Sequence, residues 1–131
     1  MPTKVGRIAL CHALTQRGGI RSEFTITKLA DHHYYVVSAG AAERYDSDFL
    51  QKKLPTDGSV TLRNITGSRG VFVLAGPRAR DVLAKLTDVP LDNASFPWLT
   101  GQVIEAGLAT DVYALRVNFV GALGWELHFP I

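Results

Sequence analysis

Apolar and polar residues alternate in several short segments of the chain, and this spacing is typical of β-strands with one buried face. The predicted strands cover residues 7–14, 24–29, 34–38, 59–65, 70–75, 102–106, 113–120 and 126–129. The run GVFVLA at 70–75 is apolar without interruption, which predicts a buried strand. Aromatic and β-branched side chains further favour a strand at 34–38.

Two other segments repeat their apolar residues at helical spacing, and we expect amphipathic helices over residues 40–54 and 77–86. The residues expected to face inward are Tyr45, Phe49, Leu50 and Leu54 in the first helix and Val82, Leu83 and Leu86 in the second. Pro55 ends the first helix because proline cannot continue the hydrogen-bond pattern. Pro77 suits the first turn of the second helix, where its missing N–H would have no partner in any case.

Short connections join these elements. Gly18 and Gly19 can adopt the positive φ that a tight hairpin needs, and residues 31–33, 57–58 and 121–124 are expected to form further turns. Such connections cannot make parallel crossovers, so neighbouring strands are expected to pair antiparallel. The order strands, helix, strands, helix, strands then predicts an α+β fold with mostly antiparallel sheets and two helices.

Composition places the chain among globular proteins. A length of 131 residues is about that of one domain, and we interpret residues 1–131 as a single domain. The net charge of +2 gives no indication of a nucleic-acid or membrane partner. No apolar run approaches the roughly 20 residues of a membrane span. The single cysteine excludes an internal disulfide and fits a reducing compartment.

Both ends of the chain lie close to strand patterns. The sequence closes on LHFPI, and the pattern VGRIALCHAL begins almost at once. Complete domains usually have polar, frayed ends. We therefore expect the chain to be part of a longer domain.

Histidine and cysteine spacing does not indicate a metal site. His32 and His33 are adjacent and so point apart, and His12 and His128 stand alone, which predicts turn and surface histidines and no bound metal. Cys11 lies in an apolar strand pattern, where cysteine is usually a small core residue. No serine has a GxSxG setting, and no glycine cluster ends in the G-K-[ST] of a phosphate loop.

Two glutamates remain as candidates for chemistry. Glu23 follows the glycine pair of the first hairpin, Glu126 follows the turn GALGWE, and each is expected to head a strand. Phe119, Trp125 and the FPW segment at 96–98 add aromatic rings. A carboxylate accepts two N–H donors in a bidentate pair, and rings stack on a flat heterocycle. Solvated surface charges and core aromatics would give the same pattern, and the residues alone leave both interpretations open.

Four segments of the chain resemble, in order and spacing, the folate-binding domain of the aminomethyltransferase family, which includes the glycine cleavage T-protein. They are RGGIRSEFTITKLADHHYYVVSAG, VTLRNITGSRGVFVLAGPRARDVLAKLT, FPWLTGQ and ALRVNFVGALGWELHFPI. The chain is most similar to the branch at the C-terminal side of dimethylglycine and sarcosine dehydrogenases. The resemblance covers nearly the whole chain, which looks like a central slice of the family's fold.

This resemblance implies tetrahydrofolate-dependent transfer of a one-carbon, aminomethyl unit. In the family, the acid after the GGI turn positions or deprotonates the folate amine, and Glu23 occupies that place. The acid that ends the G-x-x-G-[FW]-E block holds the pterin ring, and Glu126 matches it. Thr25, Phe119 and Trp98 match further folate contacts, Trp98 to within one residue. The implied partners are folate, a small amine-derived one-carbon donor and a flavin dehydrogenase domain or subunit, in the cytoplasm or, in a eukaryote, the mitochondrial matrix.

The chain departs from the family pattern at three positions. Glu23 stands where the family has aspartate, Phe119 where it usually has tyrosine, and Ala122 where an acid is common. One added methylene moves a carboxylate by about 1 Å, which can cost about 100-fold in a positioned reaction. Two alternatives to a working transferase therefore stay open: a non-catalytic folate-binding or assembly module, and an inactive fragment of a dimethylglycine or sarcosine dehydrogenase. Whether the chain is an enzyme stays open with them.

Overall fold

The computed structural model describes residues 1–131 and contains two antiparallel sheets with short helices. The first sheet has the strand order β1-β2-β3 and the second β4-β7-β6-β5. The strands are β1 (Ile8–Leu14), β2 (Ile20–Ala30), β3 (His33–Val37), β4 (Arg69–Ala75), β5 (Gly101–Ala106), β6 (Ala109–Leu115) and β7 (Gly124–Pro130). The helices are the 3-10 turns η1 (Gly40–Ala42) and η2 (Thr66–Ser68) and the α-helices α1 (Glu43–Gln51) and α2 (Ala79–Leu83). The predicted α+β fold with antiparallel sheets is confirmed.

β1 and β2 form the hairpin that the glycine pair predicts. Gly18 has a φ of 80°, and its N–H donates to the carbonyl of Thr15 to close the turn. The turn fixes a register in which His12 lies directly opposite Glu23. β3 pairs only with residues 25–30 of β2, so the hairpin continues beyond β3 as a two-stranded extension.

β7 is a central strand of the four-stranded sheet and lies between β4 and β6. β4 is an edge strand, and the prediction that its apolar run is buried is wrong. Val71, Phe72 and Val73 are all exposed. An edge strand has a sheet neighbour on one side only, so an unbroken apolar run does not by itself ensure burial.

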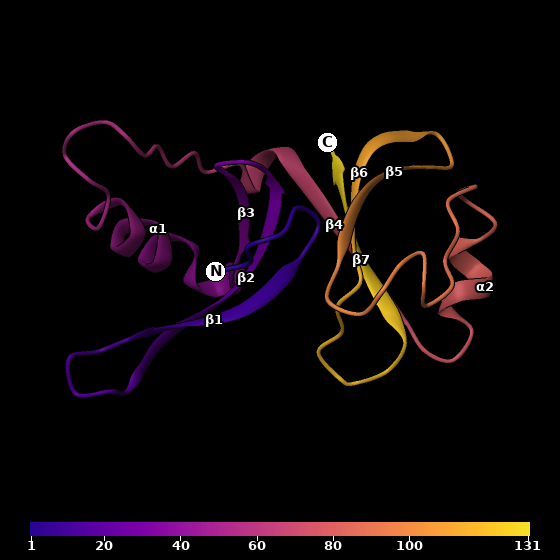
Figure 1. The fold of residues 1–131 in the computed structure, drawn as a ribbon, viewed down its shortest axis with the longest axis horizontal. Helices are drawn as coiled ribbons and strands as arrows, with labels where there is room; N and C mark the ends of the chain where they lie inside the picture. The colour runs from indigo at the N-terminus through magenta and orange to yellow at the C-terminus, as the bar shows by residue number, and fades with distance from the viewer.

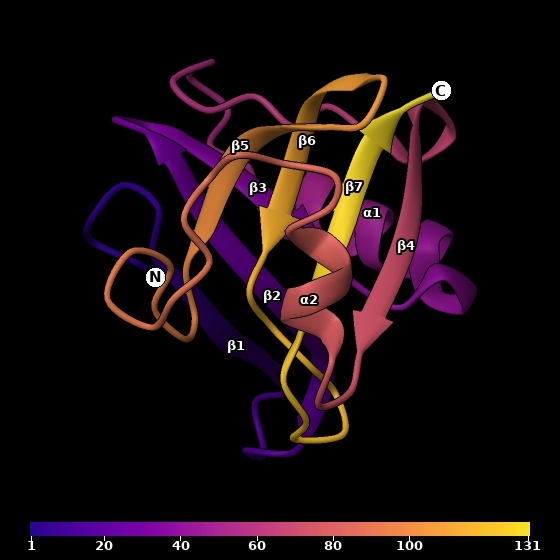
Figure 2. The same cartoon turned by 90° about the vertical axis from the view of Figure 1, so that its right-hand side faces the viewer.

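Four layers make up the molecule, and Figures 1 and 2 show them in the order α1, three-stranded sheet, four-stranded sheet, α2. The main core lies between α2 and the four-stranded sheet. Its buried members are Ala79, Leu83, Leu91, Phe96, Ile104, Val112, Ala114, Trp125 and Leu127. The rings of Phe96 and Trp125 meet edge to face with their centroids 6.0 Å apart. Removal of either ring would cost about 3–5 kcal/mol.

The first helix is shorter than its periodicity predicts and buries a different residue. Residues 40–42 form a 3-10 turn before α1, and residues 52–54 lie beyond it. The only buried residue of α1 is Asp46, which accepts a hydrogen bond of 2.5 Å from the Ser22 hydroxyl of β2. Tyr45, expected to face inward, is exposed. Phe49, Leu50 and Leu54, the other residues expected to face inward, are half-buried, so the polar contact adds to the predicted apolar face.

The second helix also departs from its prediction. α2 covers only five residues, and of the three expected inward residues Leu83 is fully buried whereas Val82 and Leu86 are exposed. Leu86 lies beyond the last helical residue and so leaves the helix face on which the pattern placed it. The periodicity thus identified a helix and one of its core residues but overestimated its length.

The strand predicted at residues 59–65 does not form. β3 and β4, which flank this segment, pair with β2 and β7, so the segment has no strand partner for its backbone groups. The strand predicted at 113–120 is displaced toward the N-terminus, since β6 covers Ala109–Leu115 and Arg116 is the first residue beyond it. Its N–H donates to the carbonyl of Thr100, and its guanidinium donates to the carbonyl of Phe96.

The two sheets contact each other directly. Arg7 and Thr100 form an isolated antiparallel bridge between the N-terminal end of the first sheet and the start of β5. A Cβ on Gly101 would lie 3.2 Å from the methyl group of Thr27 and 2.7 Å from Leu115. Glycine at 101 therefore lets the layers approach closely, and the face of β2 that carries Thr27 looks toward the four-stranded sheet.

Candidate functional site

Glu23 lies on the two-stranded extension of the β1–β2 hairpin. Side chains alternate along a strand, so Glu23, Thr25 and Thr27 share the face of β2 that looks toward the other sheet. The expectation that Glu23 heads its strand is wrong, because β2 begins at Ile20. The side chain of Glu23 is 48% exposed, since no third strand lies beside the hairpin at this level.

His12 pairs with Glu23 across the hairpin. Its Nε2 lies 2.7 Å from Oε2 of the glutamate, and both side chains are partly exposed. Even with the imidazole protonated, an exposed pair of this kind contributes at most about 1 kcal/mol to stability. Its main effect is geometric, because the contact restricts where a flexible glutamate can place its carboxylate.

Glu126 lies on the central strand β7, between its cross-strand neighbours Val73 and Leu115. The expectation that it heads its strand is also wrong, because β7 begins at Gly124. Its side chain is 26% exposed. Oε2 lies 3.2 Å from Nε2 of His128, two residues further along the strand and therefore on the same face.

His128 joins the two sheets. The prediction of a surface histidine is wrong, since only 1% of the residue is exposed. Its Nδ1 lies 3.0 Å from the hydroxyl of Tyr35 on β3, and the two rings meet edge to face with centroids 5.4 Å apart. Because Glu126 and His128 share a face, Glu126 looks toward the three-stranded sheet. Glu23 and Glu126 thus face the space between the layers from opposite sides, with no hydrogen bond or ion pair between them.

Tyr35 lies in a mixed aromatic and charged environment. Its ring meets that of Tyr113 edge to face at 5.1 Å, and the Arg69 guanidinium lies 4.3 Å from the centre of the Tyr113 ring. Burial is the main cause that raises the pKa of the Tyr35 phenol above its ordinary value, with the positive charge of Arg69 acting against it. Tyr113 and Glu126 raise this pKa further, so the phenol keeps its proton throughout the neutral range.

The aromatic candidates divide between surface and core. Phe119, in the loop between β6 and β7, is 97% exposed, and Trp98, in the loop before β5, is 48% exposed. Trp125 is fully buried on the face of β7 opposite Glu126, so it belongs to the core and cannot stack on a ligand beside that carboxylate. No aromatic contact joins Phe119 or Trp98 to another ring.

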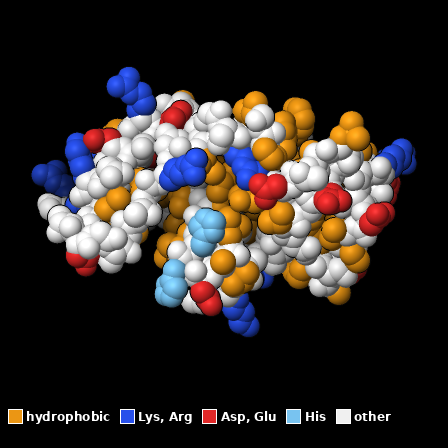
Figure 3. Space-filling view, turned by 90° about the horizontal axis from the view of Figure 1, so that it is seen from above, with side chains coloured by type: hydrophobic (Ala, Val, Ile, Leu, Met, Phe, Trp, Pro, Cys, Tyr) orange, Lys and Arg blue, Asp and Glu red, His pale blue; other side chains and the backbone are white.

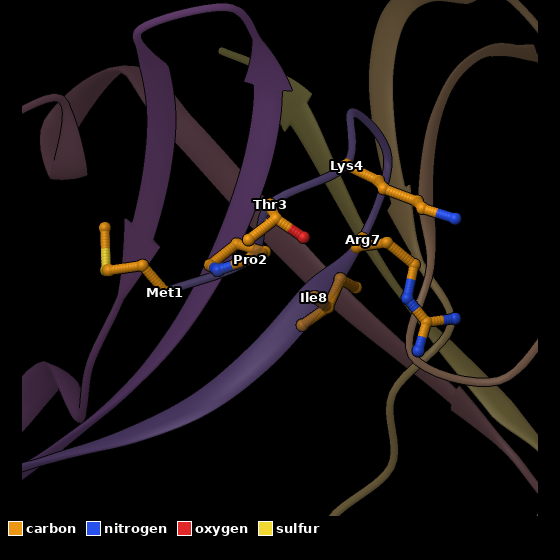
Figure 4. Close-up of a pocket in the computed structure, with 6 residues that line it drawn as sticks. All are labelled: Met1, Pro2, Thr3, Lys4, Arg7 and Ile8. Atoms are coloured by element: carbon orange, nitrogen blue, oxygen red, sulfur yellow. The ribbon is translucent and has the colours of Figure 1, made fainter.

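Two hollows of the surface lie away from both glutamates. One, of about 480 Å³, is lined by Met1, Pro2, Thr3, Lys4, Arg7 and Ile8, with the side chains of Lys4 and Arg7 directed to the same side in Figure 4. The other, of about 620 Å³, lies against α1 and the Asn64 segment. Viewed from above in Figure 3, charges of both signs are mixed over the surface and hydrophobic side chains emerge between them. Neither hollow contains a predicted site residue.

Sequence reasoning missed the two histidine partners, although signals for both exist. The GG turn predicts the hairpin and so places His12 close to the level of Glu23 on the opposite strand, although an irregularity between Ala13 and Leu14 shifts the final register by one residue. The spacing of His128 two residues after Glu126 on a strand likewise predicts a shared face. Tyr35 left no such signal, because its contact with His128 spans 93 positions of the sequence.

Comparison with known proteins gives a consistent result over the whole chain. A family model described as the GCVT N-terminal domain matches residues 1–131. Dimethylglycine dehydrogenase, mitochondrial, of Homo sapiens is 32% identical over 126 residues, which cover 95% of the chain. The pyruvate dehydrogenase phosphatase regulatory subunit, mitochondrial, of Mus musculus is 28% identical over 127 residues and 97% of the chain. An aminomethyltransferase of Chloroherpeton thalassium is 33% identical over 115 residues and 87% of the chain.

The chain is much shorter than these relatives. It spans 14% of the length of the human dehydrogenase and of the mouse regulatory subunit, and 30% of the length of the aminomethyltransferase. Among the helices of the chain, none has both the length and the apolar character needed to cross a membrane.

Proposed function

The chain belongs to the family of the GCVT N-terminal domain, and from this premise we propose that it binds tetrahydrofolate and takes part in one-carbon, aminomethyl transfer. The resemblance to aminomethyltransferases and to dimethylglycine and sarcosine dehydrogenases is confirmed. The observation that carries the proposal is the position of Glu23 and Glu126 on facing sheet surfaces, each in contact with a histidine at one carboxylate oxygen.

The chemistry of the two carboxylates fits a folate. In each glutamate Oε2 contacts the histidine, whereas Oε1 has no hydrogen-bond partner in the protein. An ionised carboxylate has about four lone-pair positions and donates no proton, so each group can accept further N–H donors. A reduced pterin carries such donors on its ring and at its amines.

The proposed roles divide between binding and orientation. Glu126 holds the pterin ring by a bidentate pair, with Phe119 and Trp98 as stacking residues and Thr25 as a further contact. Glu23 accepts a hydrogen bond from the folate amine at Oε1 and thereby orients this amine. Tetrahydrofolate, when bound, supplies the amine that takes up the one-carbon unit from an iminium-type carbon or from formaldehyde. We propose a small amine-derived donor and a flavin dehydrogenase domain or subunit as its source. The names of two relatives support a dehydrogenase in this role.

Titration with tetrahydrofolate tests the pterin assignment. Glu126→Ala removes the proposed bidentate acceptor, and we expect binding at least tenfold weaker, because hydrogen bonds to charged groups are worth about 1.5–3 kcal/mol. Glu105→Ala, at an exposed glutamate on the edge strand β5 of the same sheet, is the matched control and should leave the affinity unchanged. Equal binding by wild type and Glu126→Ala would exclude Glu126 as the pterin ligand.

The formation of methylenetetrahydrofolate from formaldehyde or an aminomethyl donor tests Glu23. Glu23→Gln keeps the size but removes the charge, and we expect the rate of methylenetetrahydrofolate formation to fall by about 100-fold, the lower end of the range for general acid–base catalysis. Glu23→Asp separates two cases. In a working transferase built around the longer acid the shorter one slows the reaction, whereas a gain in activity over an inert parent supports the alternative below.

The second candidate function is a non-catalytic folate-binding or assembly module. Two observations favour it: Glu23 stands in place of the family's aspartate, and one similar protein is a regulatory subunit by name. In this case tetrahydrofolate binds and raises the unfolding temperature, but no one-carbon transfer follows. Absence of both binding and transfer would instead indicate an inactive fragment of a dehydrogenase of this family.

The names of the relatives also bear on the cellular compartment of the chain. The dehydrogenase and the regulatory subunit are called mitochondrial, and the single cysteine needs no oxidising environment. We propose the cytoplasm or, in a eukaryotic cell, the mitochondrial matrix. Localisation of the tagged chain by microscopy tests this.

A further inference from the structure

The Glu126 carboxylate stands at the end of a chain of polar contacts that crosses the boundary between the two sheets. The contacts run from Oε2 of Glu126 to Nε2 of His128 at 3.2 Å, and from Nδ1 of His128 to the hydroxyl of Tyr35 at 3.0 Å. His128 is 1% exposed, so no bulk water competes for either ring nitrogen. Both nitrogens of this histidine are therefore committed to protein partners.

Hydrogen-bond chemistry selects one arrangement of the protons in a neutral ring. A carboxylate can only accept, so a bond between Glu126 and Nε2 requires the proton on Nε2. Nδ1 then carries a lone pair and needs a donor, which the Tyr35 hydroxyl supplies. The other neutral tautomer would place the lone pair of Nε2 against the carboxylate and lose the hydrogen bond to Glu126.

The environment of Tyr35 supports its role as the donor. Burial raises the pKa of the phenol, so the hydroxyl retains its proton. The ring is fixed by edge-to-face contacts with both Tyr113 and His128. The hydroxyl is therefore presented to Nδ1 by a rigid ring on the opposite sheet.

We propose that Tyr35 and His128 form a relay that holds the proton of His128 on Nε2 and thereby fixes the Glu126 carboxylate for its ligand, so that His128 is a positioning residue. The positioning of Glu126 for its ligand rests on the proposed folate-binding function. The placement of the proton on His128 does not depend on that function. The relay engages Oε2 and leaves Oε1 without a protein partner. Closure of the two layers is thus required for the carboxylate to be held, because Tyr35 and His128 belong to different sheets.

Nitrogen-15 NMR of the histidine rings tests the relay without any ligand. At neutral pH we expect His128 to show a protonated Nε2 and an unprotonated Nδ1, with its signals assigned by their loss in His128→Gln. In Tyr35→Phe this preference should weaken, whereas Tyr34→Phe, at the exposed neighbouring tyrosine, should leave it unchanged. A ring protonated on Nδ1 in the wild type, on that nitrogen alone or on both, would overturn the relay.

Ligand binding tests the positioning role. Glutamine places its amide near the position of Nε2 and can still donate to Glu126, whereas asparagine places its amide near Nδ1 and cannot. We expect tetrahydrofolate binding to weaken roughly tenfold in His128→Asn and less than about threefold in His128→Gln, from the value of a hydrogen bond to a charged group. His33→Asn, at an exposed histidine, is the control.

A double substitution separates positioning from a general loss of structure. If His128 acts through Glu126, His128→Asn should have no further effect on affinity in a Glu126→Gln background. Equal losses in both backgrounds, or equal affinities of the Asn and Gln variants, would overturn the positioning role. If the wild type binds no tetrahydrofolate, the proposed function fails, and the ring-nitrogen spectra alone decide whether the relay exists.

Discussion

The two carboxylate–histidine pairs of this protein use the same side chains in opposite surroundings. Glu23 and His12 meet across a two-stranded extension that no third strand covers, whereas Glu126 and His128 lie on a central strand beneath a second sheet. The side chain of the first histidine is 38% exposed and that of the second 2%. Position in the sheet, rather than residue type, therefore decides which histidine is exposed to solvent and which is buried.

This difference fits a division of roles in the proposed function. A residue that recognises a rigid ring benefits from a fixed carboxylate, because preorganisation removes the entropy cost of ordering it on binding. A residue such as Glu23, which in the proposed function contacts an amine whose bonding changes during the reaction, can act from a less rigid position. The same contrast makes the two histidines a natural pair for experiments, since one substitution can be made at both sites.

The largest expected effect is the loss of stability in His128→Ala. The substitution leaves the Tyr35 hydroxyl and Oε2 of Glu126 without their partner and opens a cavity, which together cost about 3 kcal/mol. Denaturant unfolding measures this difference. A loss below about 1 kcal/mol would mean that the boundary between the sheets rearranges and that the buried pair is not rigid.

Tyr35→Phe sharpens the comparison by removing one hydroxyl from the buried relay. We expect the free energy of unfolding at neutral pH to fall by about 1 kcal/mol, the usual net value of a hydrogen bond. Tyr34→Phe should change it little, and denaturant unfolding of both variants measures the difference.

The pH dependence has a definite sign. The pKa of Tyr35 is raised in the folded state, so above its unfolded-state pKa of about 10 the folded chain binds more protons than the unfolded chain. The corresponding stability is complete below pH 10 and is lost as the pH rises through the folded-state pKa. Tyr35→Phe should remove this part of the alkaline destabilisation, and an unchanged pH profile would contradict the burial of the phenol.

Thr27→Val tests the packing between the two sheets at a position outside the contacts of Tyr35, His128 and Glu126. Oγ1 of Thr27 is buried without a hydrogen-bond partner, and its methyl group packs beside Gly101. Replacing an unpaired hydroxyl by a methyl group of similar shape should leave stability unchanged or raise it by up to about 1 kcal/mol. A clear loss in thermal unfolding would show that this hydroxyl has a partner such as a bound water.

The smallest effect is expected for His12→Ala, which breaks the exposed pair. We expect the free energy of unfolding to change by no more than about 0.5 kcal/mol at moderate salt, because salt screening and solvent weaken a contact between exposed charges. Unfolding at low and high ionic strength should show that even this contribution fades as salt is added. A loss as large as that of His128→Ala would remove the distinction between the two pairs.

Local patterns predicted the elements whose partners are near in sequence. The glycine pair predicted the first hairpin, and alternation located most strands, because both depend on neighbouring residues. The burial of β4 and the strand at 59–65 were predicted wrongly, since an apolar run does not reveal how many neighbours a strand will have. Sheet order is set by distant segments, as the pairing of β4 with β7 illustrates.

The candidate site was predictable in its acids but not in its surroundings. Glu23 and Glu126 were found from turns and family motifs, and their roles stay predictions. The buried state of His128 could not be read from the sequence, because Tyr35 reaches it only when two sheets close on each other. Trp125 was grouped with Glu126 from adjacency, although adjacent residues of a strand point to opposite faces.

The exposed edge of β4 has a consequence for handling the chain in solution. Three consecutive apolar side chains, Val71, Phe72 and Val73, accompany backbone groups that have a partner strand on one side only. Edges of this kind are templates for aggregation, and natural proteins often protect them with lysine. The yield of soluble material should therefore fall with concentration, and a lysine at position 72 would act as a gatekeeper.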